Sequence, residues 1–221
     1  MRGVQFGGLR DVRPHPFAHG WPQLQQALSN HEVRRDKAAG GLWSPVTYKA
    51  GTTRSNGNVE YVYAFVADLD GIPLETLRPR LAGLEWHAYT THSHSDTKPS
   101  WHVVIPLLTP VHASQWRTVW ATIRAHFKVG DEVTCDASRA YFLPQRHPSR
   151  QAATASGVGA WLDWTALPRV QAASRTSRRT LPNGKTVIDW DDVEEPAELV
   201  GLTGTELITT ALHYLRRIRA A

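Results

Sequence analysis

Residues 59–70, with the sequence VEYVYAFVADLD, constrain the possible folds of this chain more than any other stretch. β-Branched and aromatic residues dominate this run, which ends at Gly71, and that composition predicts a buried β-strand. Two carboxylates, Asp68 and Asp70, lie at its end. Because alternate residues of a strand point to the same face, both side chains are expected to leave one face at the carboxyl end of the strand.

The segments after this strand continue a β-α-β-β-α-β order. We expect a helix over 74–84 (interrupted by Pro79), strands over 86–91 and 101–107, a helix over 112–127 and an extended segment over 133–143. The second helix is the clearest, because its tryptophans and aliphatic residues form one apolar stripe and Gly130 follows as a stop signal. The order predicts an α+β chain with a split-βαβ sheet, as in ferredoxin-like and RNA-recognition-motif folds.

The regions on either side of this core are less regular. An N-terminal α/β module is expected, with a helix near 21–30 and a strand near 45–50, and a capping box at 203–206 predicts a C-terminal helix. Residues 171–185 are polar and basic, as in a linker. We therefore predict a domain over 1–170 with its core at about 58–145, a linker over 171–185 and a small helical piece over 186–221.

Composition sets broad limits on partners and location. The net charge of +5 and the pI of about 9.6 are compatible with a polyanionic partner. A single cysteine, Cys135, excludes an internal disulfide and a Cys-rich zinc site. No apolar run has the length of a membrane span, and the N-terminus lacks the apolar region of a signal peptide. We expect a soluble, cytoplasmic protein without a membrane partner.

The predicted topology brings three distant polar clusters to one end of the sheet. In a β-α-β-β-α-β fold the first and third strands are antiparallel neighbours, so Ser100 and His102 at the start of the third strand should lie beside the aspartate pair. The fourth strand is expected on the other side of the first. Its start, with Asp131, Asp136 and Arg139, should then reach the same end.

This combination of residues predicts metal-dependent phosphoryl chemistry. Neighbouring carboxylates repel one another unless a cation lies between them, and all-oxygen ligands favour Mg²⁺ or Mn²⁺. Two such ions can activate a 3′ hydroxyl and stabilise a leaving pyrophosphate, while Ser100, His102 and Arg139 would donate to a triphosphate. The alternative is that Asp68 and Asp70 only end a strand and begin a turn, where aspartate is favoured.

The same residues resemble the three motifs of the archaeo-eukaryotic primase superfamily: DxD or DxE, then SxH, then an acidic motif after an apolar residue. They occur here as Asp68-Leu69-Asp70, Ser100-Trp101-His102 and the stretch 131–139. The context TTHSHSDTKPSWHVVIPL, followed by DASRAYFLPQ, is similar to prim-pol domains of phage and plasmid replication proteins, often fused to a helicase. The resemblance covers about 45–150, and an actinobacterial phage is the expected source.

The resemblance implies a DNA primase-polymerase that makes or extends primers from NTPs or dNTPs on single-stranded DNA, in the host cytoplasm and with a replicative helicase as a partner. It implies a two-metal Mg²⁺ or Mn²⁺ site on Asp68, Asp70 and a third acid. The third acid is Asp131 or Asp136, and the five-residue gap before Ser138 favours Asp131. The residues that could contact phosphates of the nucleotide or the nucleic acid are Ser100, His102, Arg139, Lys98, Lys49, Arg54, Arg146 and His147.

Two alternatives remain open from the sequence. The run from Val66 to Gly71 also resembles the nucleophile loop of haloacid-dehalogenase-type phosphatases, whose acidic metal loop would be the stretch around Asp131 and Asp136. A non-catalytic RNA-recognition-type module is the other alternative. The exposed sheet face of such a module offers aromatic side chains to bases, whereas this one would offer acids.

Overall fold

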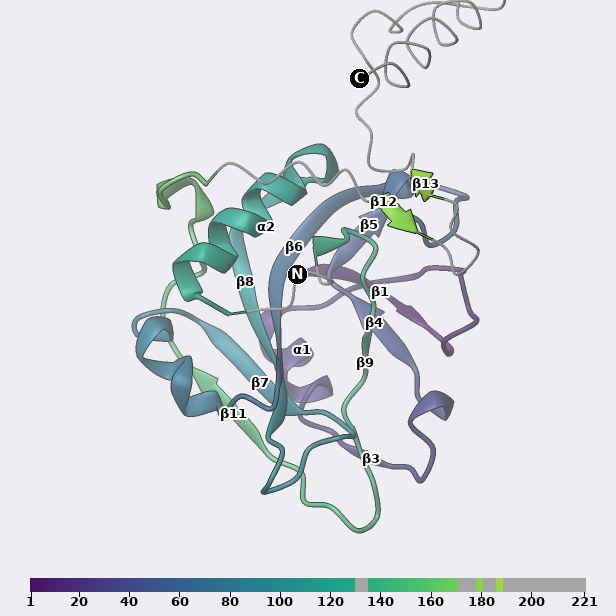
Figure 1. Ribbon diagram of the computed structural model, residues 1–221, viewed down its shortest axis with the longest axis vertical. Helices are drawn as coiled ribbons and strands as arrows, with labels where there is room; N and C mark the ends of the chain where they lie inside the picture. The colour runs from purple at the N-terminus through teal and green to yellow at the C-terminus, as the bar shows by residue number, and fades with distance from the viewer. Residues whose placement is uncertain (130–134, 171–177, 181–185, 189–221) are drawn as a thin grey trace, which may run out of the picture. The chain divides into compact units, whose positions relative to one another are not determined.

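The central element is an antiparallel five-stranded sheet in the order β11-β7-β8-β6-β5 (Figure 1). Its strands are β5 (Val46–Tyr48), β6 (Val59–Asp70), β7 (Trp86–Thr90), β8 (Ser100–His112) and β11 (Thr154–Gly157). The computed structural model describes residues 1–129, 135–170, 178–180 and 186–188. The chain divides into two compact units, residues 1–172 and 173–221, and the central sheet belongs to the first.

A second antiparallel sheet, in the order β2-β1-β4-β9, belongs to the same unit. The remaining elements among the described residues of this unit are a short parallel pair of strands, two helices and five short 3₁₀ turns. The strands are β1 (Arg2–Phe6), β2 (His15–Ala18), β4 (Leu42–Ser44), β9 (Tyr141–Phe142) and the parallel pair β3 (Glu32–Val33) and β10 (Gln145–Arg146). The helices and 3₁₀ turns are α1 (Trp21–Ala27), α2 (Ala113–Phe127), η1 (Lys37–Ala39), η2 (Asn56–Asn58), η3 (Leu74–Thr76), η4 (Arg78–Leu81) and η6 (Trp164–Ala166).

Both faces of β6 are buried, which explains why its sequence is apolar almost throughout. Its odd-numbered residues, such as Phe65 and Leu69, pack with the apolar stripe of α2, and the rings of Phe65 and Phe127 lie 6.3 Å apart. Its even-numbered residues Ala64 and Val66 pack in a second cluster with residues of α1 and β4. Figure 1 shows α2 lying across one face of β6 and β8. The aspartates continue the even-numbered face.

Several predicted elements are present: the strands at β6, β7 and β8, the helix at α2, and the N-terminal helix and strand at α1 and β5. The helix predicted over 74–84 is wrong, because that stretch forms the two short 3₁₀ turns η3 and η4. Pro79 lacks the N–H that a continuous α-helix requires, and it lies in the first turn of η4. β8 is also longer than predicted and continues through Pro106 to His112, with a shift in its register with β6.

The predicted fourth strand of the split-βαβ sheet is also wrong. β5 pairs with the edge of β6 where that strand was expected, with Val46 opposite Val62. Of the predicted extended segment over 133–143, Tyr141 and Phe142 form β9, which pairs with β4 in the second sheet. The chain is therefore α+β as predicted, but the edge of its central sheet is supplied by the N-terminal region.

The second unit has one described feature, a two-stranded antiparallel pair of β12 (Arg178–Thr180) and β13 (Thr186–Ile188). The predicted helix within 186–221 lies outside the described residues, and the predicted domain boundaries stay predictions. No helix among the described residues is long and apolar enough to cross a membrane.

Candidate active site

The first two sequence motifs lie directly opposite each other on neighbouring strands. In the register of β6 and β8, Asp68 pairs with His102 and Asp70 pairs with Ser100. Both pairs therefore project from one face of the sheet, because the two residues of each motif are two positions apart in a strand. The sequence predicted this meeting from the antiparallel packing of the first and third strands.

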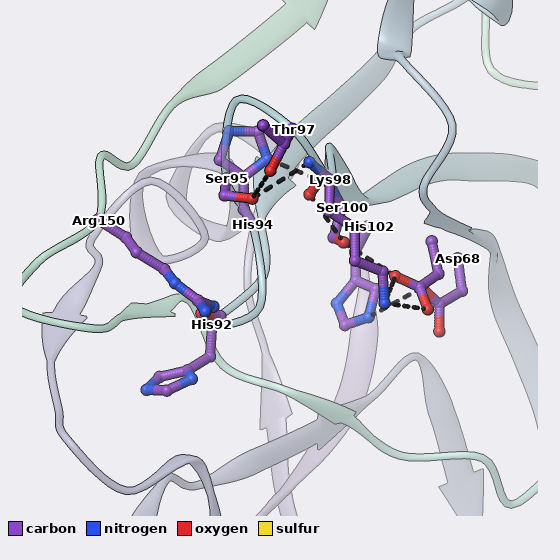
Figure 2. A network of polar contacts seen from close by, with 10 residues as sticks. Asp68, His92, His94, Ser95, Thr97, Lys98, Ser100, His102 and Arg150 are labelled. Carbon is purple, nitrogen blue, oxygen red and sulfur yellow. Dashed lines mark hydrogen bonds and ion pairs between the residues drawn. The ribbon is translucent and has the colours of Figure 1, made fainter.

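The polar contacts of these residues form a short network (Figure 2). The Ser100 hydroxyl donates to Asp70 Oδ1 at 3.0 Å, and Lys98 Nζ lies 3.1 Å from Asp70 Oδ2. His102 Nε2 lies 3.8 Å from Asp68 Oδ1. The backbone N–H of Ser100 donates to His94 Nδ1 at 3.1 Å, which holds the loop before β8 against the start of the strand.

Asp70 of the first motif and His102 of the second differ in their exposure to solvent. Asp70 is exposed, and the hydrogen bond from Lys98 holds the pKa of its carboxyl below the ordinary value. His102 is buried, and desolvation lowers its pKa to about 4, with the Asp68 carboxylate opposing the shift. At neutral pH the site therefore contains an ionised Asp70 and a neutral imidazole.

A cleft of about 470 Å³ opens over this face of the sheet. Its lining includes both aspartates, Ser100 and His102, and it also includes Asp136, Ser138 and Arg139 of the third motif. The third motif reaches the cleft without the predicted fourth strand. The Asn56 side chain fixes this segment: its Nδ2 donates to Asp136 Oδ1 at 3.4 Å and its Oδ1 accepts from the Ser138 N–H at 2.9 Å. The Ser44 hydroxyl donates to the Arg139 carbonyl at 2.7 Å. Asp131, the favoured third acid, lies outside the described residues.

The phosphate-contact residues suggested by the sequence separate into three places. Arg54 lines the cleft and its guanidinium lies over the ring of Phe6. Lys49 lines a different cavity of about 480 Å³. Arg146, on β10, donates to the Arg150 carbonyl at 3.3 Å, and the ring of His147 lies 5.9 Å from that of His92.

Sequence reasoning missed three side chains that line the cleft or contact its lining residues. Lys37 lines it, and its ammonium lies 5.1 Å from the centre of the Phe142 ring. Tyr141 lines it as well, with its ring 5.3 Å from that of His102. Tyr89 lies beneath, with its hydroxyl 2.9 Å from His102 Nδ1. Lys37 stands in an irregular region without a pattern, and the two tyrosines have the composition of ordinary core residues.

The donor set suits a hard divalent cation, although the described residues do not complete a site. Asp68 and Asp70 present carboxylates from one face, and the Lys98 ammonium already occupies a cationic position beside Asp70. Among residues 1–129 and 135–170, no three histidine, cysteine or acidic side chains are close enough together to hold a metal ion. Asp136 lines the same cleft but stands outside such a group.

No protein-family model and no curated protein matches the sequence. Among solved structures, the chain is similar to the AEP domain of the primase-polymerase of cyanophage S-2L, with a TM-score of 0.46 and 14% sequence identity. The superposition covers 74% of this chain and 84% of that chain. AEP denotes the archaeo-eukaryotic primases, the superfamily whose motifs the sequence resembles.

Proposed function

We propose that this chain is a DNA primase-polymerase, which joins NTPs or dNTPs on a single-stranded DNA template to make or extend primers. One observation carries the proposal: the pairing of Asp68 with His102 and of Asp70 with Ser100, at the edge of a cleft that also contains Asp136 and Arg139. The carboxylates and the hydrogen-bond donors of three separate segments face one volume, as transfer of a nucleotide from a triphosphate requires.

Asp68 and Asp70 would hold Mg²⁺ or Mn²⁺, with Asp131 or Asp136 as the third acid. Bound in pairs, these ions lower the barrier to in-line attack by a 3′ hydroxyl and stabilise the leaving pyrophosphate. The exposed carboxylate of Asp70 suits this role, since a metal can reach it from solvent by replacing the ammonium of Lys98.

The remaining polar side chains would bind the triphosphate. Ser100 and Arg139 carry donors that face the cleft, and Lys98 becomes free for a phosphate once it leaves Asp70. His102 offers Nε2 on the side of Asp68. Lys37 is a further cation in the cleft. In this arrangement, the acids bind metal and the donors orient the phosphates. None of these side chains is the nucleophile, and the attacking hydroxyl comes from the primer or the first nucleotide.

The nucleic acid would extend from the cleft over basic surface. Arg54 lines the cleft, and the ring of His147, which follows Arg146, lies beside that of His92, a neighbour of the cleft residues Thr91 and Ser93. We assign these residues to the DNA phosphates, whose contacts contribute affinity without reading sequence. Lys49 lines a separate cavity, so its contribution would be independent of the cleft. A replicative helicase, fused or separate, is the expected partner.

The sheet topology favours this function over the phosphatase. A haloacid-dehalogenase-type enzyme places its nucleophile at the end of a parallel strand, whereas every pairing in the five-stranded sheet is antiparallel. The RNA-recognition-type module is also disfavoured. The sheet face that carries the aspartates is covered, at Ala64 and Val66, by the second apolar cluster, so it offers no open platform for bases.

A nucleotide-incorporation assay tests the proposal. The chain is incubated with a single-stranded template, labelled nucleotides and Mg²⁺ or Mn²⁺, with and without a primer, and we expect products longer than the primer. Asp68→Ala combined with Asp70→Ala should reduce incorporation by about a thousandfold or more, because metal stabilisation of the transition state contributes several kcal/mol. The thermal unfolding of the double variant should stay close to that of the parent chain.

The matched control is Glu75→Ala combined with Glu60→Ala, which removes two carboxylates that lie outside the cleft. It should retain full incorporation. Normal incorporation by the folded aspartate variant would refute the metal site. A beryllium fluoride adduct on Asp68, without nucleotide binding, would indicate the phosphatase instead.

A further inference from the structure

Tyr89, in β7, has a buried hydroxyl with three hydrogen-bond partners. The indole Nε1–H of Trp43 donates to it at 2.9 Å, it donates to the Phe142 carbonyl at 3.0 Å, and His102 Nδ1 lies 2.9 Å away. The side chain is completely excluded from solvent, and burial raises the pKa of the phenol, so the hydroxyl stays protonated. A buried hydroxyl with its donor and both acceptor positions in use cannot turn without losing a bond.

The three partners belong to three different elements. His102 is on β8, Trp43 is on β4, and Phe142 is on β9, three residues after Arg139. Ser44, the neighbour of Trp43, also donates to the Arg139 carbonyl. Tyr89 therefore joins the second motif to the segment that carries the third, across the boundary between the two sheets.

The aromatic packing around His102 restricts its ring further. Tyr89 meets the imidazole at an interplanar angle of 86° with a centroid distance of 5.1 Å, and Tyr141 meets it at 75° and 5.3 Å. With Nδ1 held by the Tyr89 hydroxyl, Nε2 is the ring nitrogen that remains for a ligand on the side of Asp68.

We infer that Tyr89, itself held by Trp43, is a positioning residue that aims His102 Nε2 into the cleft for a nucleoside triphosphate. The inference rests on the proposed function and extends it to two buried residues outside the three motifs. When the hydroxyl donates to the Phe142 carbonyl, it accepts from Nδ1–H and Nε2 carries a lone pair. When the hydroxyl gives up that bond and donates to Nδ1, Nε2–H can donate to a phosphate, and this is the tautomer that the triphosphate role requires.

The kinetic test is a double-mutant cycle between Tyr89→Phe and His102→Ala. Tyr89→Phe keeps the ring and removes the hydroxyl, so we expect the nucleotide KM to rise about tenfold, equivalent to one lost hydrogen bond, with kcat changed less than threefold. In the His102→Ala background, Tyr89→Phe should raise KM no further. Additive effects in the double variant would overturn the inference, since a purely structural tyrosine acts independently of His102.

The matched control is Trp21→Phe. It removes the hydrogen bond of 2.6 Å from Trp21 Nε1 to Glu85 Oε1. Trp21 belongs to the same apolar cluster as Tyr89 and Trp43 but does not line the cleft. Its nucleotide KM should equal that of the parent chain. If Tyr89→Phe does not fold, Trp43→Phe replaces it, and a rise in KM in the same direction is expected because the Tyr89 hydroxyl loses one of its three anchors.

A measurement without nucleotide separates this inference from the proposed function. The ¹⁵N resonances of the His102 ring, identified by their loss in His102→Ala, should show a single tautomer in the parent chain and an average of two in Tyr89→Phe. Unchanged ring resonances in Tyr89→Phe would overturn the positioning role even in an active enzyme. If the parent chain binds no nucleotide, the proposed function fails, and the resonances alone decide the role of Tyr89.

Discussion

The ion pair between Lys98 and Asp70 places a cation where the proposed function requires a metal. Lys98 Nζ lies 3.0 Å from Asp70 Oδ1, and the two side chains are 56% and 63% exposed. An ion pair this exposed contributes about 1 kcal/mol or less. A divalent metal can therefore displace Lys98 at small cost, which leaves the ammonium free for a phosphate.

We predict opposite effects of Lys98→Met on metal and nucleotide. Mn²⁺ should bind up to about fivefold more tightly, because it no longer competes with the ammonium, whereas the nucleotide KM should rise. Titration calorimetry with Mn²⁺ and initial rates at saturating Mn²⁺ measure the two effects. Lys128→Met, at the end of α2, is the control for loss of charge. Equal Mn²⁺ affinity in the parent chain and Lys98→Met would show that the ammonium does not compete with the metal for Asp70.

At the scale of elements, β11 is held at the edge of the central sheet by a close backbone contact just after it. Ala160 N–H donates to the Gly83 carbonyl at 3.0 Å, and Glu85 N–H donates to the Ala160 carbonyl at 2.8 Å. A methyl group on Gly159 would lie 2.2 Å from the Gly83 carbonyl oxygen. The backbone hydrogen bonds between Ala160 and the segment before β7 therefore require that residue 159 has no side chain.

Gly159→Ala should destabilise the chain by about 1–3 kcal/mol, because the clash is with backbone that cannot move aside. Gly57→Ala is the control, since its added methyl group meets no atom within 4 Å. Urea unfolding of both variants measures the difference. A loss of equal size in the two variants would indicate a general effect of replacing glycine and not the contact at Gly83.

At the scale of the whole molecule, buried histidines make the stability depend on pH. Burial lowers the pKa of His87 and of His31 below the ordinary value of 6.5. In the window between 6.5 and the lower folded pKa, the unfolded chain binds more protons than the folded chain. The free energy of unfolding must therefore fall as the pH falls through this window.

We expect the free energy of unfolding, measured by urea at pH 7.5 and 5.5, to be smaller at the lower pH. Each unit of pKa depression is worth about 1.4 kcal/mol once the pH lies below the folded value. His87→Gln, which cannot titrate, should show a weaker pH dependence than the parent chain. The same slope in both proteins would mean that His87 is not one of the groups responsible.

The division of the chain into two compact units leads to a prediction about priming. Because residues 1–172 form one unit and contain the cleft, a chain ending at residue 172 should extend an existing primer at the parent rate. The start of new primers should become slower, because we propose that residues 186–221, which follow the predicted linker over 171–185, hold the initiating nucleotide or the template. Primer extension and priming without a primer measure the two activities. Equal priming by the shortened and the full chain would contradict this role.

Local sequence patterns were enough to predict the strand over 59–70, the helix over 112–127 and the same-face placement of Asp68 and Asp70. These features depend on the period of side chains along one element, which is a local property of the backbone. The meeting of this pair with Ser100 and His102 was also predictable, because antiparallel pairing of two strong apolar strands leaves few registers that keep both faces buried.

Three features were not predictable from local patterns: which strand covers the edge of β6, how the third motif reaches the cleft, and which side chains support His102. By sequence, either β5 or the extended segment over 133–143 could pair with that edge. The choice depends on long-range packing with the sheet of β1, β2, β4 and β9, which no local period encodes. Tyr89 and Trp43 have the composition of core residues, so their role emerges only when folding brings their polar atoms within hydrogen-bond distance of the imidazole and of one another.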